Sequence, residues 1–212
     1  DKYKAKGLDD ELAGIYGMVE NMDMNMGRLL KKLEDTGLAD ETIVLFLTDN
    51  GPNGVRFNGG MKGIKGSVDE GGVRVPCFWR WRGKITPGNI PIPGAHIDIL
   101  PTLAELCHLK KVQTKPLDGV SLARTLSGEN QQVNRNLFTH VAFLQVPVVP
   151  YPGAVRNYPY TLIVGNQSPK LYNIQKDSAQ QQDIAGENPD LARQLLEDYH
   201  RWFAEVSKEI QP

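Results

Sequence analysis

The strongest constraint in this sequence is the run Thr-Ile-Val-Leu-Phe-Leu at residues 42–47. A short, uninterrupted apolar run that is rich in β-branched and aromatic side chains is typical of a strand buried on both faces. Residues 8–32 precede it with Leu, Ile and Met side chains at every third or fourth position. This spacing predicts an amphipathic helix whose apolar stripe packs in a core. A helix followed by a buried strand is the order found in α/β domains with a parallel sheet.

The α/β pattern continues to about residue 130. Apolar spacing predicts a second strand and two further helices, at residues 73–81, 96–109 and 121–126. Beyond this point the chain changes to short β-rich runs that Pro, Gly and Asn separate. These runs predict three strands, at residues 137–143, 154–164 and 170–174. The last predicted element is an amphipathic helix that begins at Asn188 and Pro189.

We therefore expect an α/β fold in two parts. Residues 1–130 are expected to form the α/β domain. Residues 131–212 are expected to form a small antiparallel sheet that is covered by the C-terminal helix. The sequence contains no internal repeat that would favour a solenoid.

Composition excludes several classes of protein. Of the 212 residues, 40% are apolar and 23% are charged, which is ordinary for a globular domain. The net charge of -1 offers no electrostatic footprint for nucleic acid. No segment approaches the roughly 18–20 consecutive apolar residues of a membrane span. The chain begins at Asp1, with neither an initiator Met nor a signal peptide, which predicts a processed product or a piece of a longer protein.

Two polar side chains, Asp49 and Asn50, follow the predicted strand at residues 42–47 directly. Ligands of open α/β sheets bind at the carboxyl ends of strands. A carboxylate and an amide carbonyl are hard oxygen donors, which suit Ca²⁺ or Mg²⁺ better than zinc or copper. The alternative is an ordinary turn, because Asp-Asn-Gly is also good turn chemistry. Two ligands are too few for calcium, so any metal site needs further oxygens from elsewhere.

A long glycine-rich loop at residues 51–72 follows these two side chains. Loops of this length inside a domain are usually functional. Its segment Gly-Met-Lys-Gly-Ile-Lys-Gly-Ser at residues 60–67 combines close backbone approach with the positive charges of Lys62 and Lys65, which favours an oxyanion ligand. The glycine-lysine spacing is not that of a P-loop. The alternative is a flexible loop with solvated lysines.

These two motifs together resemble the second signature region of the type I sulfatases, or arylsulfatases. The resemblance rests on Thr48–Gly51 and on the segment Gly-Ile-Lys-Gly-Ser-Val-Asp-Glu-Gly-Gly-Val-Arg-Val-Pro at residues 63–76. Further similar segments follow in the family's order, at residues 96–102, 117–122, 154–156, 160–163 and 170–174. The resemblance implies the C-terminal part of an alkaline-phosphatase-like α/β domain, followed by the small antiparallel sheet with its C-terminal helix.

The resemblance also assigns roles to individual residues. Asp49 and Asn50 match the family's calcium ligands, and Lys65 matches the catalytic lysine that contacts sulfate. Lys62 and His140 are expected to contact the substrate. The motif positions Glu70, Gly71, Gly72 and Arg74 are expected to shape the loop.

The family's nucleophile is a formylglycine made within a Cys/Ser-x-Pro-x-Arg motif, which these 212 residues lack. Cys77 and Cys107 both stand in other contexts. We therefore expect the chain to be the C-terminal half of a sulfatase. The formylglycine would lie in the missing N-terminal half, and the chain alone would be inactive.

The function that this resemblance implies is calcium-dependent hydrolysis of a sulfate ester, on a glycan or an aryl group. Export to a periplasm or to the outside is expected by resemblance. Two alternatives stay open: a phosphoryl- or phosphonate-ester hydrolase of the same superfamily, and a non-catalytic fragment. Because half of a parallel sheet would be missing, we expect the chain to self-associate through an exposed sheet edge and apolar face.

Overall fold

A computed structural model describes residues 2–109, 115–142 and 148–208 of the chain. The chain forms two units. Unit 1 comprises Asp1–Phe46 and Cys77–Pro87, and unit 2 comprises Leu47–Pro76 and Gly88–Pro212. The expected division into domains at residues 130 and 131 stays a prediction.

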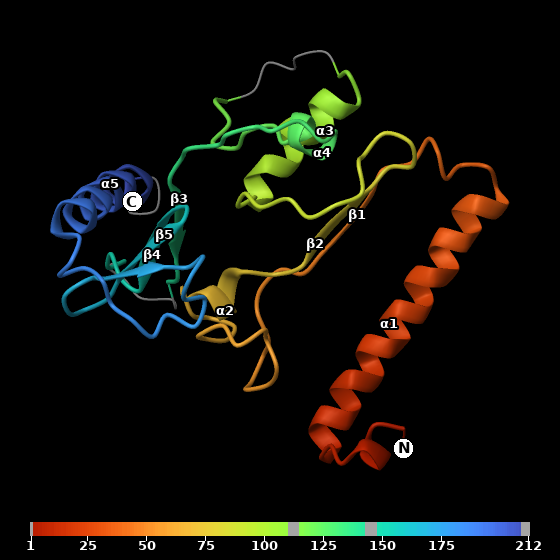
Figure 1. The fold of residues 1–212 in the computed structure, drawn as a ribbon, viewed down its shortest axis with the longest axis horizontal. Coiled ribbons are helices and arrows are strands. Elements are labelled where there is room, and N and C mark those ends of the chain that lie inside the picture. The colour runs from red at the N-terminus through yellow and green to blue at the C-terminus, as the bar shows by residue number, and fades with distance from the viewer. Residues whose placement is uncertain (1, 110–114, 143–147, 209–212) are drawn as a thin grey trace. The chain divides into compact units, whose positions relative to one another are not determined.

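Unit 1 is built around one long helix. A short 3-10 helix, η1 (Lys4–Lys6), precedes α1 (Asp10–Asp35), which confirms the helix predicted at residues 8–32. The Asp9 carboxylate accepts a hydrogen bond of 2.8 Å from the Leu12 backbone N–H and so caps its first turn. The predicted strand at residues 42–47 is present as β1 (Val44–Leu47), which pairs with β2 (Cys77–Arg80) in a two-stranded sheet (Figure 1). Its residues are half-buried or exposed, so the prediction that it is buried on both faces is wrong for this chain.

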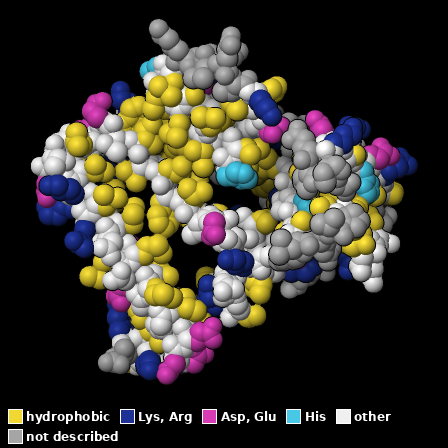
Figure 2. All heavy atoms as spheres, turned by 180° about the vertical axis from the view of Figure 1, so that it is seen from behind, with side chains coloured by type: hydrophobic (Ala, Val, Ile, Leu, Met, Phe, Trp, Pro, Cys, Tyr) yellow, Lys and Arg dark blue, Asp and Glu magenta, His cyan; other side chains and the backbone are white. Residues whose placement is uncertain are grey.

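The apolar stripe of α1 is exposed. Met18, Met22 and Leu29 are 66%, 46% and 52% accessible, and Figure 2 shows hydrophobic side chains along α1 at the left of the view. The prediction that this stripe packs in a core is wrong for unit 1. A 26-residue helix is about 39 Å long, whereas four-residue strands span about 13 Å and cannot cover it.

No helix in the described part of the chain combines the length with the apolar content that crossing a bilayer requires.

Unit 2 contains the antiparallel sheet. Its strand order is β3 (Leu137–His140), β4 (Gly153–Asn157), β5 (Tyr160–Val164) and β6 (Lys170–Asn173), and every neighbouring pair is antiparallel. The single strand predicted at residues 154–164 is therefore wrong. The chain reverses between Asn157 and Tyr160, which pair with each other, and Pro159 lies in the turn because it has no N–H for a sheet ladder.

The C-terminal helix α5 (Pro189–Ser207) packs against this sheet, as expected (Figure 1). Its Leu195 and Tyr199 side chains meet Val155, Leu162 and Leu171 from three strands. All five side chains are at most 2% accessible. This cluster is the hydrophobic core of the unit, and it fixes the sheet on which the loop described below rests.

Shorter helices complete unit 2: α2 (Glu70–Val73), η2 (His96–Asp98), α3 (Ile99–Leu106) and α4 (Ala123–Leu126). Because residues 70–73 form a helical turn, the strand predicted at residues 73–81 begins only at Cys77. The predicted strand at residues 137–143 ends at His140 in the sheet, and residue 143 lies outside the described residues.

A buried ion pair supports the start of α3. The Arg135 guanidinium donates two hydrogen bonds to the Asp98 carboxylate. The backbone N–H groups of Ala95 and Val120 also donate to this carboxylate, at 2.7 and 2.9 Å. Burial raises the pKa of Asp98, but the hydrogen bonds from Arg135, Val120 and Ala95 outweigh burial and lower it below its usual value.

We predict that Tyr199→Phe stabilises the chain. The Tyr199 hydroxyl is buried without a hydrogen-bond partner among the described residues, so its removal should raise the free energy of unfolding by about 1 kcal/mol. Burial also raises the pKa of Tyr199 to about 12. The unfolded tyrosine loses its proton near pH 10, so the free energy of unfolding of the wild type should fall relative to the variant as the pH rises from 10 to 12. Urea unfolding followed by circular dichroism measures both effects, and an equal or lower stability of the variant at neutral pH would contradict the first.

We predict that the isolated 212-residue chain self-associates. Within the described residues, β1 and β2 pair only with each other, and the stripe of α1 is accessible, so an edge and an apolar face are both free to bind. The double variant Met18→Lys/Met22→Lys should lower the mass measured by light scattering. The control Glu20→Gln/Asn21→Lys changes the charge of α1 by the same two units outside the predicted stripe and should not. A wild-type chain that stays monomeric as its concentration rises would overturn the prediction.

Candidate functional site

The backbone joins the two sequence motifs in unit 2. The Gly51 N–H donates to the Gly72 carbonyl at 2.8 Å, and the Lys65 N–H donates to the Pro52 carbonyl at 3.0 Å. A Cβ atom on Gly51 would lie 1.8 Å from the Gly71 carbonyl oxygen, so only glycine permits this approach. The residues that follow β1 are therefore held against both the middle and the end of the long loop.

The loop also closes on itself. The Gly71 N–H donates to the Lys62 carbonyl at 2.6 Å. The Asn58 side-chain amide donates to the carbonyls of Met61 and Gly63, at 2.8 and 3.1 Å. Gly63 has a φ of 89°, which is a conformation that favours glycine. These contacts give the glycine-rich segment a defined path around Lys62 and Lys65.

Asp49 and Asn50 lie next to this junction. Asp49 is exposed, and its Oδ1 atom accepts a hydrogen bond of 2.9 Å from the Asn50 backbone N–H. Asn50 is half-buried. This geometry agrees with turn chemistry, and the carboxylate and amide oxygens are also donors of the kind that calcium takes. Within the described residues, no group of three or more His, Cys, Asp or Glu side chains is placed to hold a metal. The donor types therefore fit Ca²⁺ or Mg²⁺, but the set is incomplete.

The two lysines of the loop have different surroundings. Lys65 is exposed, and its backbone is fixed by Pro52. The Lys62 Nζ atom lies 3.3 Å from Asp69 Oδ1 and 5.6 Å from the ring centroid of Tyr172 on β6. Lys62 thus already has an anionic and an aromatic partner, and its expected contact with a substrate stays a prediction.

His140 lies at the end of β3, away from the loop in sequence. Its Nε2 atom is 2.8 Å from the Val149 carbonyl oxygen, and its ring is 5.2 Å from the ring of Phe203 on α5. The structure therefore joins Asp49, Asn50 and Lys65 through one hydrogen-bonded backbone, whereas the contacts given for His140 are with other segments.

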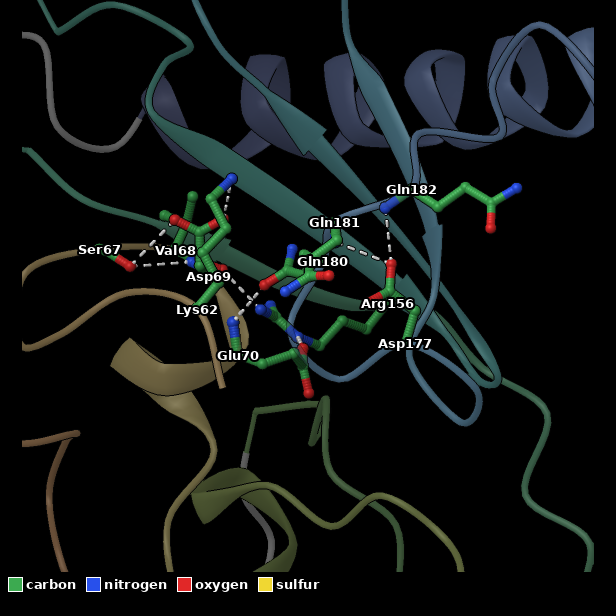
Figure 3. A network of polar contacts seen from close by, with 10 residues as sticks. All are labelled: Lys62, Ser67, Val68, Asp69, Glu70, Arg156, Asp177, Gln180, Gln181 and Gln182. Carbon is green, nitrogen blue, oxygen red and sulfur yellow. Dashed lines mark hydrogen bonds and ion pairs between the residues drawn. The ribbon is translucent and has the colours of Figure 1, made fainter. Parts of the chain in front are cut away.

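The loop rests on a buried polar network that the sequence did not reveal (Figure 3). Arg156 on β4 donates from Nε to Glu70 Oε1 at 2.8 Å, and from Nη2 to the Val68 carbonyl at 2.5 Å. Glu70 and Arg156 are 2% and 8% accessible. The Glu70 backbone N–H donates to Gln180 Oε1 at 2.8 Å. The sequence does place a charged residue, Glu70, in the predicted loop and another, Arg156, in a predicted strand. Nothing in the sequence shows that these two side chains meet.

The chain matches known proteins along most of its length. A family model described as Sulfatase matches residues 2–109. Steryl-sulfatase from Mus musculus is 38% identical over 148 residues, which cover 63% of this chain and 24% of that protein. A sulfatase from Formosa agariphila is 33% identical over 242 aligned positions, which cover 95% of this chain and 42% of that protein. The crystal structure of Ps i-CgsB in complex with k-i-k-neocarrahexaose matches with a TM-score of 0.83 and 26% identity, over 92% of this chain and 44% of that one.

The chain forms a part of the alkaline-phosphatase-like fold of its structural neighbours, since it covers 44% of the chain of Ps i-CgsB. The matched residues include both motifs, and the chain belongs to the sulfatase family. It spans 24% and 42% of the lengths of the two relatives described above.

Proposed function

We propose that the whole protein carrying this chain hydrolyses sulfuric esters. The observation that carries the proposal is the junction of Gly51 with Gly72 and of Pro52 with Lys65, which holds two oxygen donors and an exposed cationic side chain on one connected backbone. Membership of the sulfatase family supports it. A pair of metal-binding oxygens beside a cation is suited to an ester group that carries negative charge.

Lys65 is the proposed catalytic residue. Its ammonium group would donate charge-assisted hydrogen bonds to the sulfuryl oxygens or to the leaving oxygen. Because Lys65 is exposed and its backbone is fixed, its side chain can approach a substrate without breaking a hydrogen bond that holds the loop. Lys62 and His140 are proposed as additional substrate contacts.

Asp49 and Asn50 are the proposed ligands of Ca²⁺, with Mg²⁺ as the alternative ion. A bound cation would supply Lewis-acid polarisation and charge neutralisation. The remaining ligands and a formylglycine nucleophile would come from residues outside these 212, since the sequence lacks the Cys/Ser-x-Pro-x-Arg motif. We therefore expect no turnover by the isolated chain in the assay described below.

The substrate class is proposed to be a sulfated glycan or an aryl sulfate. The neighbour Ps i-CgsB is seen in complex with k-i-k-neocarrahexaose, which supports a carbohydrate. A periplasmic or secreted location is proposed on the family resemblance alone.

Replacing Lys65 tests the proposed reaction. In the whole protein supplied with calcium, Lys65→Ala should lower kcat/KM for an aryl sulfate about 10²–10³-fold, because a preorganised cation at the charged group is lost. The control Lys84→Ala removes an exposed lysine of unit 1 and should leave the rate unchanged. The matched aryl phosphate is measured beside the sulfate. A preference for phosphate would move the assignment to a phosphoryl-ester hydrolase, and no activity on either ester would favour a non-catalytic protein.

Replacing Asp49 tests the metal site. Asp49→Ala in the whole protein should weaken calcium binding on the order of 100-fold, because one charged oxygen ligand is lost. Isothermal titration with calcium measures the affinity without need of turnover. Asp23→Ala removes an exposed carboxylate of α1 and serves as the control. Equal affinities of the wild type and Asp49→Ala would exclude Asp49 as a ligand.

A further inference from the structure

The Arg156 guanidinium connects the long loop to the antiparallel sheet of unit 2. Its three nitrogens all donate: Nε to Glu70, Nη2 to the Val68 carbonyl at 2.5 Å, and Nη1 to Thr139 Oγ1 on β3 at 3.1 Å. Figure 3 shows Arg156 reaching from β4 to the residues around α2. Arg156 and Glu70 are 86 positions apart in the sequence. One side chain therefore fixes two points of the loop to two strands of the sheet.

A second contact reaches the same place from beyond β6. The Gln180 side-chain oxygen accepts from the Glu70 N–H, and Gln180 is 4% accessible. Gln180 has a φ of 51°, which non-glycine residues rarely adopt. The Asp177 carboxylate holds this turn, because it accepts from the N–H groups of Gln181 and Gln182 at 2.8 and 2.9 Å. The unusual backbone conformation of Gln180 is thus held by hydrogen bonds to Asp177, and it directs the Gln180 side chain toward Glu70.

The residues around Glu70, which Arg156 and Gln180 hold by hydrogen bonds, are continuous in the chain with the candidate site. Glu70 is followed directly by Gly71 and Gly72, whose N–H and carbonyl groups hold Lys62 and Gly51. Gly51 adjoins Asn50, and the next residue, Pro52, holds the Lys65 N–H. A shift of Glu70 relative to β4 would therefore be passed through backbone hydrogen bonds to both the oxygen donors and the lysine.

The chemistry of the Glu70–Arg156 ion pair favours a role in positioning the residues of the candidate site. Burying two charges costs solvation, and apolar residues of similar volume often give equal stability. The planar guanidinium offers donors in a fixed fork, so it specifies directions as well as distances, which a lysine cannot reproduce. An ion pair that contributes little net stability and fixes geometry is suited to a site that has to hold reacting groups within narrow limits.

We propose that Arg156 and Glu70 are positioning residues, through which the C-terminal sheet sets the placement of Lys65 and Asn50. This inference rests on the proposed sulfate ester hydrolysis. Neither residue is proposed to touch the substrate. Their effect would reach the reaction only through the backbone of residues 51–72.

The test compares two buried ion pairs of unit 2 in the whole protein. Arg156→Met removes the guanidinium that holds the loop to the sheet. Arg135→Met is the control, because its buried partner Asp98 accepts hydrogen bonds from Ala95, Val120 and Arg135 and not from the loop, in the described part of the chain. At a temperature where thermal unfolding shows both variants to be folded, Arg156→Met should lower kcat for an aryl sulfate about 10²-fold with a smaller change in KM. Arg135→Met should keep kcat within about threefold, since its cost falls on stability. Equal kcat values for the two folded variants would overturn the proposal.

A double-variant cycle separates positioning from general destabilisation. If Arg156 acts through Lys65, Arg156→Met should cost much less in a Lys65→Ala background, whereas independent effects would multiply. Multiplying effects would contradict the proposal. The milder variants Arg156→Lys and Glu70→Gln keep most of the volume and replace Arg156→Met in the cycle if that variant does not fold.

Amide hydrogen exchange gives a readout that does not depend on activity. In Arg156→Met, exchange should accelerate at the N–H groups of Gly51, Lys65 and Gly71 more than in the core of β4 and β5. Unchanged protection in residues 51–72 would refute the positioning role. If the wild-type protein hydrolyses no sulfate ester, the proposed function fails, and the exchange result still decides whether Arg156 holds the loop.

Discussion

The buried guanidinium of Arg156 makes the loop and the antiparallel sheet of unit 2 depend on each other. Without Arg156, the loop that carries Lys65 would be attached to the rest of unit 2 mainly through the Gln180 contact and the approach of Lys62 to the Tyr172 ring on β6. With it, the loop shares a polar network with β3 and β4, whose other face is packed by α5. The hydrophobic core under α5 therefore has a second role, because a strand that is fixed by packing is a firm support for a charged side chain.

The candidate site shows how little of a site needs to be in one continuous motif. Asp49 and Asn50 belong to the end of a strand, and Lys65 belongs to a loop without regular structure. Backbone hydrogen bonds of Gly51 with Gly72 and of Lys65 with Pro52 bring them onto one support. Small residues are required at these crossings since a Cβ on Gly51 or Gly72 would overlap carbonyl oxygens of the opposing segment.

Local sequence patterns predicted the elements that one segment defines by itself. The helix at residues 8–32 and the C-terminal helix follow from apolar spacing, and the strand at residues 42–47 follows from a continuous apolar run. The hairpin of β4 and β5 was missed because its turn is only two residues long, Tyr158 and Pro159, and lies inside one β-rich segment. The motif residues of the site could be named from the sequence. The contact of Glu70 with Arg156 could not be predicted, because it joins segments whose distance depends on how the whole sheet folds.

The connection between β1 and β2 has a consequence for how relatives can diverge. The strands at its two ends pair with each other, and the Gly51–Gly72 hydrogen bond closes its base. The outer stretch contains Val55 and Phe57, which are 92% and 84% accessible. The entropic cost of closing a loop grows only logarithmically with its length, so insertions near Val55 would cost little. Evolution can therefore lengthen or rewrite this outer stretch while the closed base keeps its register.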